Sequence, residues 1–389
     1  MITNYINARI IDKNSNYLGC VTVNDKIIVY AGPESDCPYK EPDNTVDVKG
    51  YALMPSFIDM HCHLRDPGYP EKETLETGMR AALAGGYTTL CAMANTRPVC
   101  ATPDAVKSNT ERAEKMQMCR LIQCAAAGYD LHDETPTDYA ALSKVTRIIS
   151  NDGVTIFSDE FMSNLLIAST DYGFIISTHC QPERHIVARD IALLKKLGGN
   201  LHIGHISRSE TAQMVREAKA QGLSLTCEIT PHHLFAHDLD YKVNPPIRTE
   251  ADVCALIAAI KDGTADCLST DHAPHTPEDK EKGLAGISNI EHAMQIYLKV
   301  FFDNNISLKR FSEMTSYTPA RLLRMNAGLI KCGYLADIVI ADTECKGFIE
   351  KDKMISRSHN TPFDGREVRG KVLRTICGGK VKYDNGLLG

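Results

Sequence analysis

ALMPSFIDMHCH, residues 52–63, is an apolar run that ends in two histidines, and YTTLCAMANT, residues 87–96, is a second run of strand-like composition. The amphipathic segment between them closes on Gly85 and Gly86, as helices commonly do. Six further runs alternate with amphipathic segments in the same way, and they comprise residues 119–128, 153–159, 173–179, 200–207, 223–230 and 266–272. Eight such units predict an α/β fold in which the parallel strands close into a (β/α)8 or TIM barrel. An open doubly wound sheet is disfavoured, because no glycine-rich phosphate loop follows the first strand.

The two ends of the chain have a different sequence pattern from the central region. Short β-branched runs separated by polar turns, such as ARIID at residues 8–12, precede the first barrel strand, and similar runs return in GYLADIVIAD at residues 333–342. We predict that residues 1–54 and residues 333–389 pair into one small β-domain, and that residues 55–332 form the barrel.

The composition excludes several classes of protein. A net charge of -6 with interspersed acidic and basic residues offers no basic tract for a nucleic acid. No window approaches the roughly 18 to 20 apolar residues that cross a bilayer, and no signal peptide opens the chain. The 14 cysteines lie mostly in apolar runs without a CxxC pair, as expected for reduced thiols. We therefore expect a cytoplasmic protein that binds neither nucleic acid nor a membrane.

Side chains that can bind a metal lie at the ends of five predicted strands. They are His61, His63, Asp159, His179, His205 and Asp271. In a barrel these ends meet at one mouth, and residues two apart in a strand, such as His61 and His63, face the same way. A single histidine is more often a packing or surface residue than a ligand, but six such residues are hard to explain as a buried polar cluster. Imidazole and carboxylate groups favour zinc or a similar divalent ion.

Most of the other histidines are assigned to different roles. His202 precedes His205 by three residues in one strand, so we expect it to face away and pack. His232 and His233 are interpreted as structural. Five histidines in helices or loops are expected to contact solvent, namely His132, His185, His237, His292 and His359.

Longer motifs surround the strand-end residues. They are PSFIDMHCHLRDPG (55–68), GGYTTLCAMANTRP (85–98), FSDE (157–160), HIGHIS (202–207), TPHHL (230–234), NPPIR (244–248), DGTADCLSTDHAPHT (262–276) and HNTPFDGREVRGKV (359–372). Together they resemble, from end to end, the bacterial dihydroorotases of the cyclic amidohydrolase superfamily. Hydantoinases, allantoinases and animal dihydroorotases carry a carboxylated lysine where this chain has Asp159. The resemblance is therefore to the class with aspartate at that position.

The resemblance implies zinc-dependent, reversible hydrolysis of L-dihydroorotate to N-carbamoyl-L-aspartate in pyrimidine biosynthesis. It implies two zinc ions per chain, the first held by His61, His63, Asp159 and Asp271 and the second by Asp159, His179 and His205. Asp271 would act as general base toward water and then as acid toward the leaving ring nitrogen.

A carboxylate on the substrate needs a cationic partner. Arg65 lies two residues beyond His63 and has the planar fork that binds a carboxylate bidentately, although a surface salt bridge is the alternative role. The resemblance adds further substrate contacts, and the full predicted set is His63, Arg65, Asn95, Asn244, His275, Ala285 and Gly286.

Some positions depart from the family pattern. The interval from His179 to His205 is shorter than in the usual family member. Gln181 occupies a position where the family commonly has an acidic residue, and Ala94 and Asn289 replace a proline and a glycine. Another cyclic amidohydrolase, of the hydantoinase or allantoinase type, remains an alternative. A catalytically silent barrel that partners aspartate transcarbamoylase is a second alternative. A homodimer and an association with that transcarbamoylase are the assemblies left open.

Overall fold

The computed structural model describes residues 1–386 and 388, and its centre is a ring of parallel strands. The strands are β6 (Phe57–Cys62), β7 (Tyr87–Ala92), β8 (Arg120–Gln123), β9 (Ile148–Ser150), β10 (Ile175–Thr178), β11 (Leu201–Ile203), β12 (Leu225–Ile229) and β13 (Cys267–Leu268). β6 to β8 form one sheet and β9 to β13 form another. Parallel bridges from Ala125 to Ile149 and from Cys62 to His272 join the two sheets at both edges. The ring is therefore closed, and the predicted (β/α)8 barrel is confirmed.

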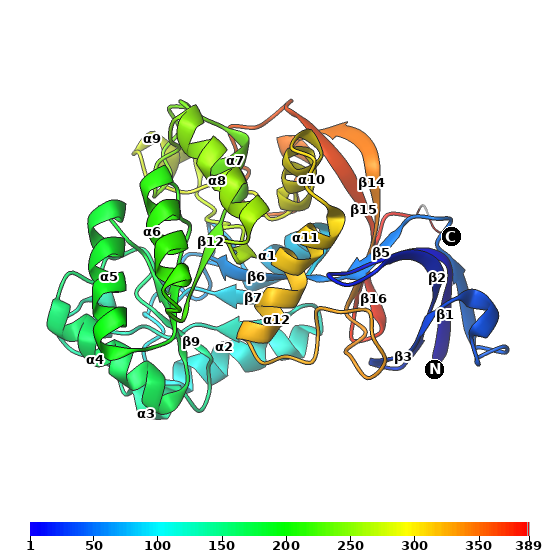
Figure 1. Cartoon of the computed structure of the whole chain (residues 1–389), viewed down its shortest axis with the longest axis horizontal. Coiled ribbons are helices and arrows are strands. Elements are labelled where there is room, and N and C mark those ends of the chain that lie inside the picture. Colours follow the sequence, from blue (N-terminus) through cyan, green and yellow to red (C-terminus); the bar gives the residue numbers. More distant parts are fainter. Residues whose placement is uncertain (387, 389) are drawn as a thin grey trace.

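Helices lie on the outside of this barrel (Figure 1). The longer ones are α1 (Leu75–Ala84), α2 (Pro103–Met116), α4 (Asp159–Tyr172), α5 (Glu183–Leu197), α6 (Ser209–Ala220), α8 (Glu250–Asp262) and α10 (Ala293–Asp303). Short helices complete the set, namely α3 (Tyr139–Leu142), α7 (Pro231–Phe235), α9 (Pro277–Glu281), α11 (Leu308–Ser312) and α12 (Thr318–Leu322). Gly85 ends α1 where a Cβ would lie 2.3 Å from the carbonyl oxygen of Ile290, so only glycine fits there.

The two chain ends form one sheet beside the barrel, at the right of Figure 1. Its strands run in the order β16, β15, β14, β5, β1, β2 and β3, with β4 paired to β1. Their bounds are β1 (Ile2–Ile11), β2 (Asn16–Asn24), β3 (Ile27–Gly32), β4 (Asn44–Asp47), β5 (Ala52–Pro55), β14 (Ile338–Phe348), β15 (Glu367–Cys377) and β16 (Lys380–Asp384). The predicted pairing of the chain ends is confirmed, because β5 lies between β1 and β14 and joins the two halves.

One end of the barrel is closed by packing. Ala320 of α12 and Leu323, which follows it, belong to one buried apolar cluster with Ile58, Met60 and Cys91 of the first barrel strands. The amino-terminal ends of the strands are therefore covered by α12. The carboxyl-terminal ends remain the open end, where barrel enzymes hold their active sites.

The predicted position of the fourth strand was wrong. Residues 153–158 form no strand, residue 159 begins α4, and the fourth strand is β9, five residues upstream. Ile148–Ser150 pairs in register with Ile175–Ser177 of β10, whereas Phe157 is 63% exposed. The sequence of residues 153–159 has strand-like composition, but the barrel closes through residues 148–150. These residues can form backbone hydrogen bonds with the segments on both sides of them.

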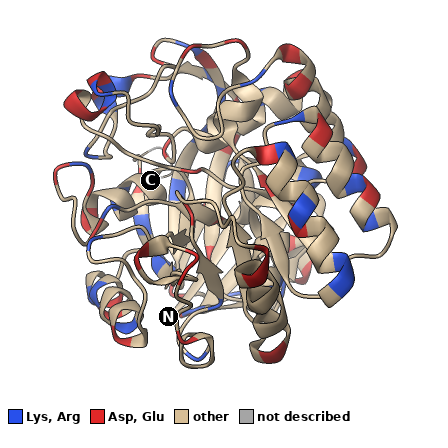
Figure 2. Cartoon of the chain, turned by 90° about the vertical axis from the view of Figure 1, so that its left-hand side faces the viewer, with Lys and Arg blue, Asp and Glu red and all other residues tan. Residues whose placement is uncertain are grey.

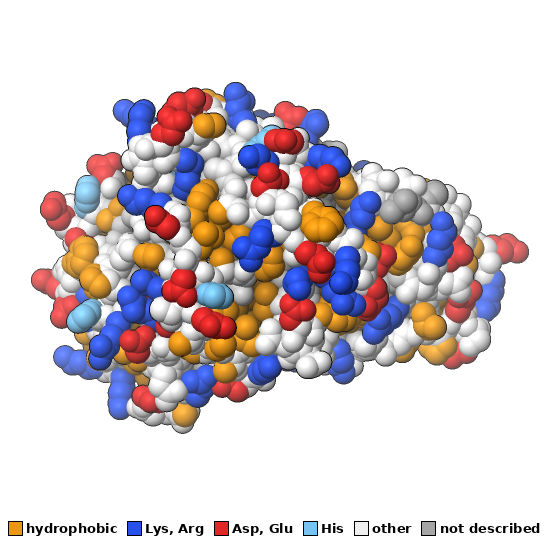
Figure 3. Space-filling model, turned by 90° about the horizontal axis from the view of Figure 1, so that it is seen from above, with side chains coloured by type: hydrophobic (Ala, Val, Ile, Leu, Met, Phe, Trp, Pro, Cys, Tyr) orange, Lys and Arg blue, Asp and Glu red, His pale blue; other side chains and the backbone are white. Residues whose placement is uncertain are grey.

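Charged residues of both signs are mixed on the side of the barrel seen in Figure 2. Lysine and arginine alternate there with aspartate and glutamate along the outer helices. On the face seen from above, hydrophobic side chains are flanked by charged ones (Figure 3). None of the helices in the described part of the chain is both long and apolar enough to cross a membrane.

Candidate metal centre and substrate pocket

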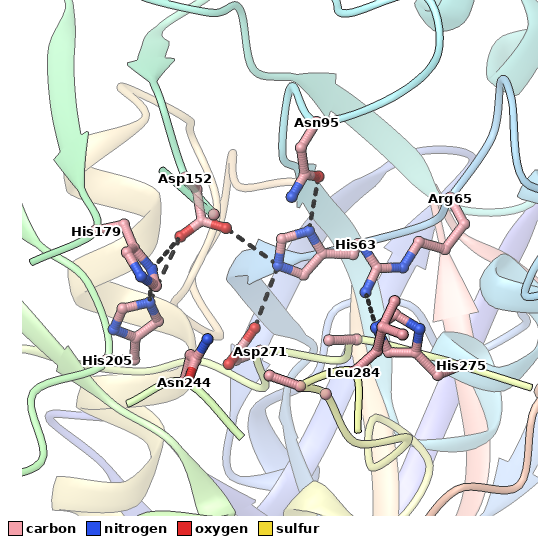
Figure 4. Close-up of a pocket in the computed structure, with 14 residues that line it drawn as sticks. His63, Arg65, Asn95, Asp152, His179, His205, Asn244, Asp271, His275 and Leu284 are labelled. Carbon is pink, nitrogen blue, oxygen red and sulfur yellow. Dashed lines mark hydrogen bonds and ion pairs between the residues drawn. The ribbon is translucent and has the colours of Figure 1, made fainter. Parts of the chain in front are cut away.

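Two groups of potential metal ligands share one buried carboxylate, that of Asp152. The first group is His61, His63 and Asp152, and the second is Asp152, His179 and His205; the ligand atoms of each group lie within 4.8 Å of one another. Oδ1 of Asp152 lies 3.3 Å from Nε2 of His61, and Oδ2 lies 3.2 Å from Nε2 of His63. On the other side, Oδ1 lies 3.4 Å from Nδ1 of His179 and 3.5 Å from Nε2 of His205. Figure 4 shows this carboxylate between the labelled imidazoles.

The structure corrects the predicted ligand Asp159. Its side chain is 73% exposed, lies in the first turn of α4, and forms an ion pair with Arg189 at 2.9 Å. Asp152 follows the true fourth strand and takes the place that the sequence analysis gave to Asp159. The error arose because the fourth strand was predicted too far along the chain. Active-site residues of a barrel lie at the carboxyl ends of its strands, and β9 ends at Ser150, two residues before Asp152. The motif ISND at residues 149–152, a short apolar run followed by a carboxylate, is the signal that was missed.

The geometry fits a bound divalent metal. Two ligand atoms about 2.1 Å from a tetrahedral ion lie about 3.4 Å apart, and the contacts of Asp152 range from 3.2 to 3.5 Å. Nε2 of His61 and Oδ1 of Asp152 are both buried without a hydrogen-bond partner. Buried polar atoms are rarely left unsatisfied, so their convergence indicates a cation between them.

Electrostatics keep the carboxylate of Asp152 ionised. Burial alone would raise its pKa, but the charge of His61 and the close ring nitrogens of His179 and His205 hold the pKa of Asp152 well below its usual range.

Asp271 stands beside the first group. Its Oδ1 lies 3.3 Å from Nε2 of His63 and 3.7 Å from Nε2 of His61, and its Oδ2 lies 4.0 Å from Nε2 of His232. Burial opposes ionisation, yet the hydrogen bond with His63 and the charge of His61 lower the pKa of Asp271. Its φ of 44° is in the left-handed region, where a non-glycine residue is strained by about 1 to 3 kcal/mol. Such strain is common at functional sites.

A second carboxylate lies behind the ligands. Glu228 of β12 is fully buried, and its Oε1 lies 2.6 Å from Nδ1 of His61 while its Oε2 lies 3.1 Å from Nε2 of His202. Ser269 also donates a hydrogen bond to it. Nδ1 of His61 therefore donates to Glu228, and its Nε2 is the ring nitrogen that faces Asp152. The sequence analysis missed Glu228, although a glutamate inside the apolar run LSLTCEIT was a visible signal.

The other histidines divide into buried and exposed groups. His202 is buried as expected, although it bonds to Glu228 and Thr226 in addition to packing. His232 and His233 are buried, and burial lowers the pKa of His232 to about 4, so this ring is neutral. His132, His185, His237 and His359 are exposed, but His292 is half-buried and bonds to Gln295.

A cavity of about 250 Å³ opens onto the two groups of ligands. Its lining contains every residue of the predicted substrate-binding set, namely His63, Arg65, Asn95, Asn244, His275, Ala285 and Gly286. Asp152, His179, His205 and Asp271 also line it, so the potential ligands and the substrate contacts share one space (Figure 4).

The cationic side of the cavity is formed by Arg65. Its Nε donates to the carbonyl oxygen of Pro274 at 3.2 Å, and its Nη2 lies 3.3 Å from Nε2 of His275. Nδ1 of His275 lies 3.2 Å from Oδ2 of Asp279, and burial together with the charge of Arg65 lowers the pKa of His275 to about 4. A neutral His275 that donates to Asp279 accepts from Arg65 through Nε2 and orients the guanidinium.

The remaining contacts shape the cavity walls. Oδ1 of Asn95 lies 2.9 Å from Nδ1 of His63, so Asn95 orients this ring and lines the cavity as well. Gly286 has a φ of 152°, and a Cβ there would lie 2.4 Å from the carbonyl oxygen of Ala273. Asn289, which replaces a glycine of the family pattern, donates from Nδ2 to the carbonyl oxygen of Thr270 at 2.8 Å and ties this loop to the end of β13.

The shortened segment after His179 leads directly into α5. This helix begins at Glu183, whose buried carboxylate accepts hydrogen bonds from the backbone of Ser207 at 2.9 Å and of Arg208 at 3.2 Å. The loops after β10 and β11 are therefore joined by one carboxylate, and His179 and His205 at these strand ends are held together.

Comparison with known proteins agrees with this geometry. The model of the amidohydrolase family matches residues 52–382. A dihydroorotase of Clostridium botulinum is 36% identical over 393 residues, which covers 97% of this chain and 98% of that protein. A dihydroorotase of Anaplasma phagocytophilum is 34% identical and covers 97% and 94% of the two chains. The structure of an L-hydantoinase from Arthrobacter aurescens superposes with a TM-score of 0.90 at 22% identity, covers 100% of this chain and 97% of that one, and shows the shared fold.

Proposed function

This chain belongs to the amidohydrolase family, among its dihydroorotases, and from that premise we propose that it catalyses the reversible hydrolysis of L-dihydroorotate to N-carbamoyl-L-aspartate with zinc. One observation carries the assignment of substrate. The guanidinium of Arg65 lines the same cavity as the two groups of potential metal ligands, and no Asp or Glu among the described residues forms an ion pair with it. A substrate carboxylate would supply that missing partner.

We assign the metal ligands from the two groups that the structure brings together. His61, His63, Asp152 and Asp271 would hold one zinc ion, and Asp152, His179 and His205 would hold the second. Zinc ions bound here would lower the pKa of water to about 7 and polarise the ring carbonyl. Glu228 would keep His61 in the tautomer that binds a metal.

Asp271 has the position and the protonation state of a general base. Its carboxylate lines the cavity, and its lowered pKa keeps it ionised, which is the form that can accept a proton from the attacking water. It then donates this proton to the ring nitrogen as the amide C–N bond breaks. In the ring-closing direction the same carboxylate removes a proton from the attacking nitrogen and returns it to the departing oxygen.

Arg65, Asn95 and His275 would bind the carboxylate of the substrate. The neutral ring of His275 leaves the positive charge of Arg65 uncancelled, and Asp279 fixes that ring from behind. Asn244, Ala285 and Gly286, which line the same cavity, would contact the ring itself. A bidentate charged contact orients the ring amide relative to the metal ligands.

The two alternatives make different demands. A hydantoinase-type site would place a lysine among the ligands, but no lysine lines this cavity in the described part of the chain. A silent barrel would not need a complete ligand set.

We also propose a cytoplasmic location, which is supported by the free state of the 14 cysteines. A homodimer and a complex with aspartate transcarbamoylase stay predictions, to be measured by light scattering with and without that partner.

The deciding experiment is turnover by the purified protein alone. L-dihydroorotate and N-carbamoyl-L-aspartate should both be converted, whereas hydantoin, allantoin and dihydrouracil should be poor substrates. Faster turnover of a neutral ring would favour the hydantoinase-type alternative, and no turnover of any ring by zinc-loaded protein would favour the silent barrel.

A further inference from the structure

A second polar cleft lies at the opposite end of the barrel from the substrate pocket. It is bordered by the first residues of three strands, Ile175, Leu201 and Leu225, and by residues of α12. Its volume is about 170 Å³, several times the roughly 30 Å³ that one water molecule occupies in the liquid. The full lining is Arg147, Gly173, Ile175, Asn200, Leu201, Ser224, Leu225, Thr226, Arg321, Leu322 and Arg324.

The charge of this cleft is entirely positive. Arg147, Arg321 and Arg324 line it, and its described lining contains no aspartate or glutamate. Several arginines elsewhere in the chain form ion pairs, as Arg120 does with Asp337 at 2.9 Å and Arg216 does with Asp262 at 2.8 Å. Among the residues that the structure describes, no carboxylate forms an ion pair with any of the three arginines of the cleft.

Arg147 is the least satisfied of the three. Its Nε is buried and has no hydrogen-bond partner. Burial and the nearby charge of Arg324 both lower the pKa of Arg147, so the two cations lie close enough to repel each other. A buried donor without an acceptor is destabilising, and an anion in the cleft would supply the missing acceptor.

Ordinary roles explain only part of the cluster. Arg324 lies near Gly173, which caps the end of α4, where a helix favours a cation. Arg321 donates to the carbonyl oxygen of Met325 at 2.7 Å. Neither role is seen for Arg147, which lines the cleft directly before β9.

We propose that this cleft binds a phosphoryl group, either as free phosphate or as the phosphate of a small metabolite such as a nucleotide. Guanidinium groups bind phosphate oxygens bidentately, and three of them match an anion that carries more than one negative charge. Asn200, Ser224 and Thr226 add neutral polar groups to the same walls. The site is separate from Arg65, which lies at the other end of the barrel.

Calorimetric titration of the zinc-loaded protein tests the site with inorganic phosphate, pyrophosphate and ATP at constant ionic strength. We expect saturable binding that Arg147→Met and Arg324→Met each weaken about tenfold or more. Arg184→Met is the matched control, because this exposed arginine of α5 forms no ion pair in the described structure and lies outside both cavities. Arg65→Met separates the cleft from the substrate pocket, and both controls should bind like the wild type.

The relative affinities for phosphate and ATP identify the ligand. Equal affinity for phosphate and ATP would identify free phosphate as the ligand, and at least tenfold tighter binding of ATP would identify a nucleotide. Arg324→Lys retains the charge and should bind more tightly than Arg324→Met, which distinguishes lost contacts from misfolding. The proposal is overturned if no anion saturates, if Arg147→Met and Arg324→Met bind like the wild type, or if Arg65→Met alone abolishes binding.

Discussion

Replacing Asp152 by asparagine should remove metal from both halves of the centre. The substitution keeps the size of a buried side chain but removes the negative charge that lies 3.2 to 3.5 Å from four imidazoles. Structural zinc sites with about four ligands bind with roughly 10 to 16 kcal/mol, so one ligand contributes on the order of 3 kcal/mol. Because Asp152 belongs to both groups, we expect the affinity of each zinc ion to fall roughly a hundredfold.

Asp159→Asn is the matched control for this experiment. It makes the same chemical change seven positions later, at a side chain that is 73% exposed and forms an ion pair with Arg189. A surface ion pair contributes about 0 to 1 kcal/mol, so zinc affinity and turnover should stay at the wild-type level.

The assay is zinc content by mass spectrometry during a titration with a competing chelator, with circular dichroism to verify folding. Wild type and Asp159→Asn should retain zinc at chelator concentrations that strip Asp152→Asn. If Asp152→Asn holds as much zinc as the wild type, or if Asp159→Asn loses it, the assignment of the shared ligand is refuted.

Four further predictions follow from the site. Arg65→Met should lower kcat/KM for L-dihydroorotate roughly 30-fold or more while leaving zinc content and the slow turnover of dihydrouracil unchanged, and equal losses on both rings would contradict carboxylate recognition. Asp271→Asn should reduce turnover in both directions by several orders of magnitude in a folded protein, so near-normal rates would exclude it as the base. Glu228→Gln should weaken zinc binding about 10-fold to 100-fold, whereas unchanged chelator competition would show that this carboxylate does not orient His61. His275 has its pKa lowered from 6.5 to about 4, so the unfolded chain binds a proton that the native state does not. The wild type should therefore lose stability relative to His275→Asn as the pH falls from 6.5 toward 4, and parallel denaturation curves for the two proteins would show that the ring titrates normally.

Some features of this protein were determined by the sequence itself. The barrel follows from alternating apolar runs and amphipathic segments, because each pattern has the period of its own secondary structure. His61 and His63 share one face because residues two apart in a strand must do so. These are local rules, and the structure follows them.

Other features were decided only when the chain closed on itself. Residues 153–159 and residues 148–150 both have the composition of a strand, and the choice between them depends on the hydrogen bonds that β8 and β10 offer. That choice moved the shared carboxylate from Asp159 to Asp152. Glu228 is distant in sequence from His61, and only the barrel brings the two side chains to 2.6 Å.

The physical reason is the same in each case. Periodicity and residue type act over a few neighbouring positions, so they specify which elements form and which side chains can do chemistry. Contacts between distant segments determine the register of a barrel and the partners of a buried charge. They also bring Arg147 close to Arg321 and Arg324 at the end of the barrel that α12 covers. Those contacts are set by closure and packing, and no single stretch of the sequence encodes them.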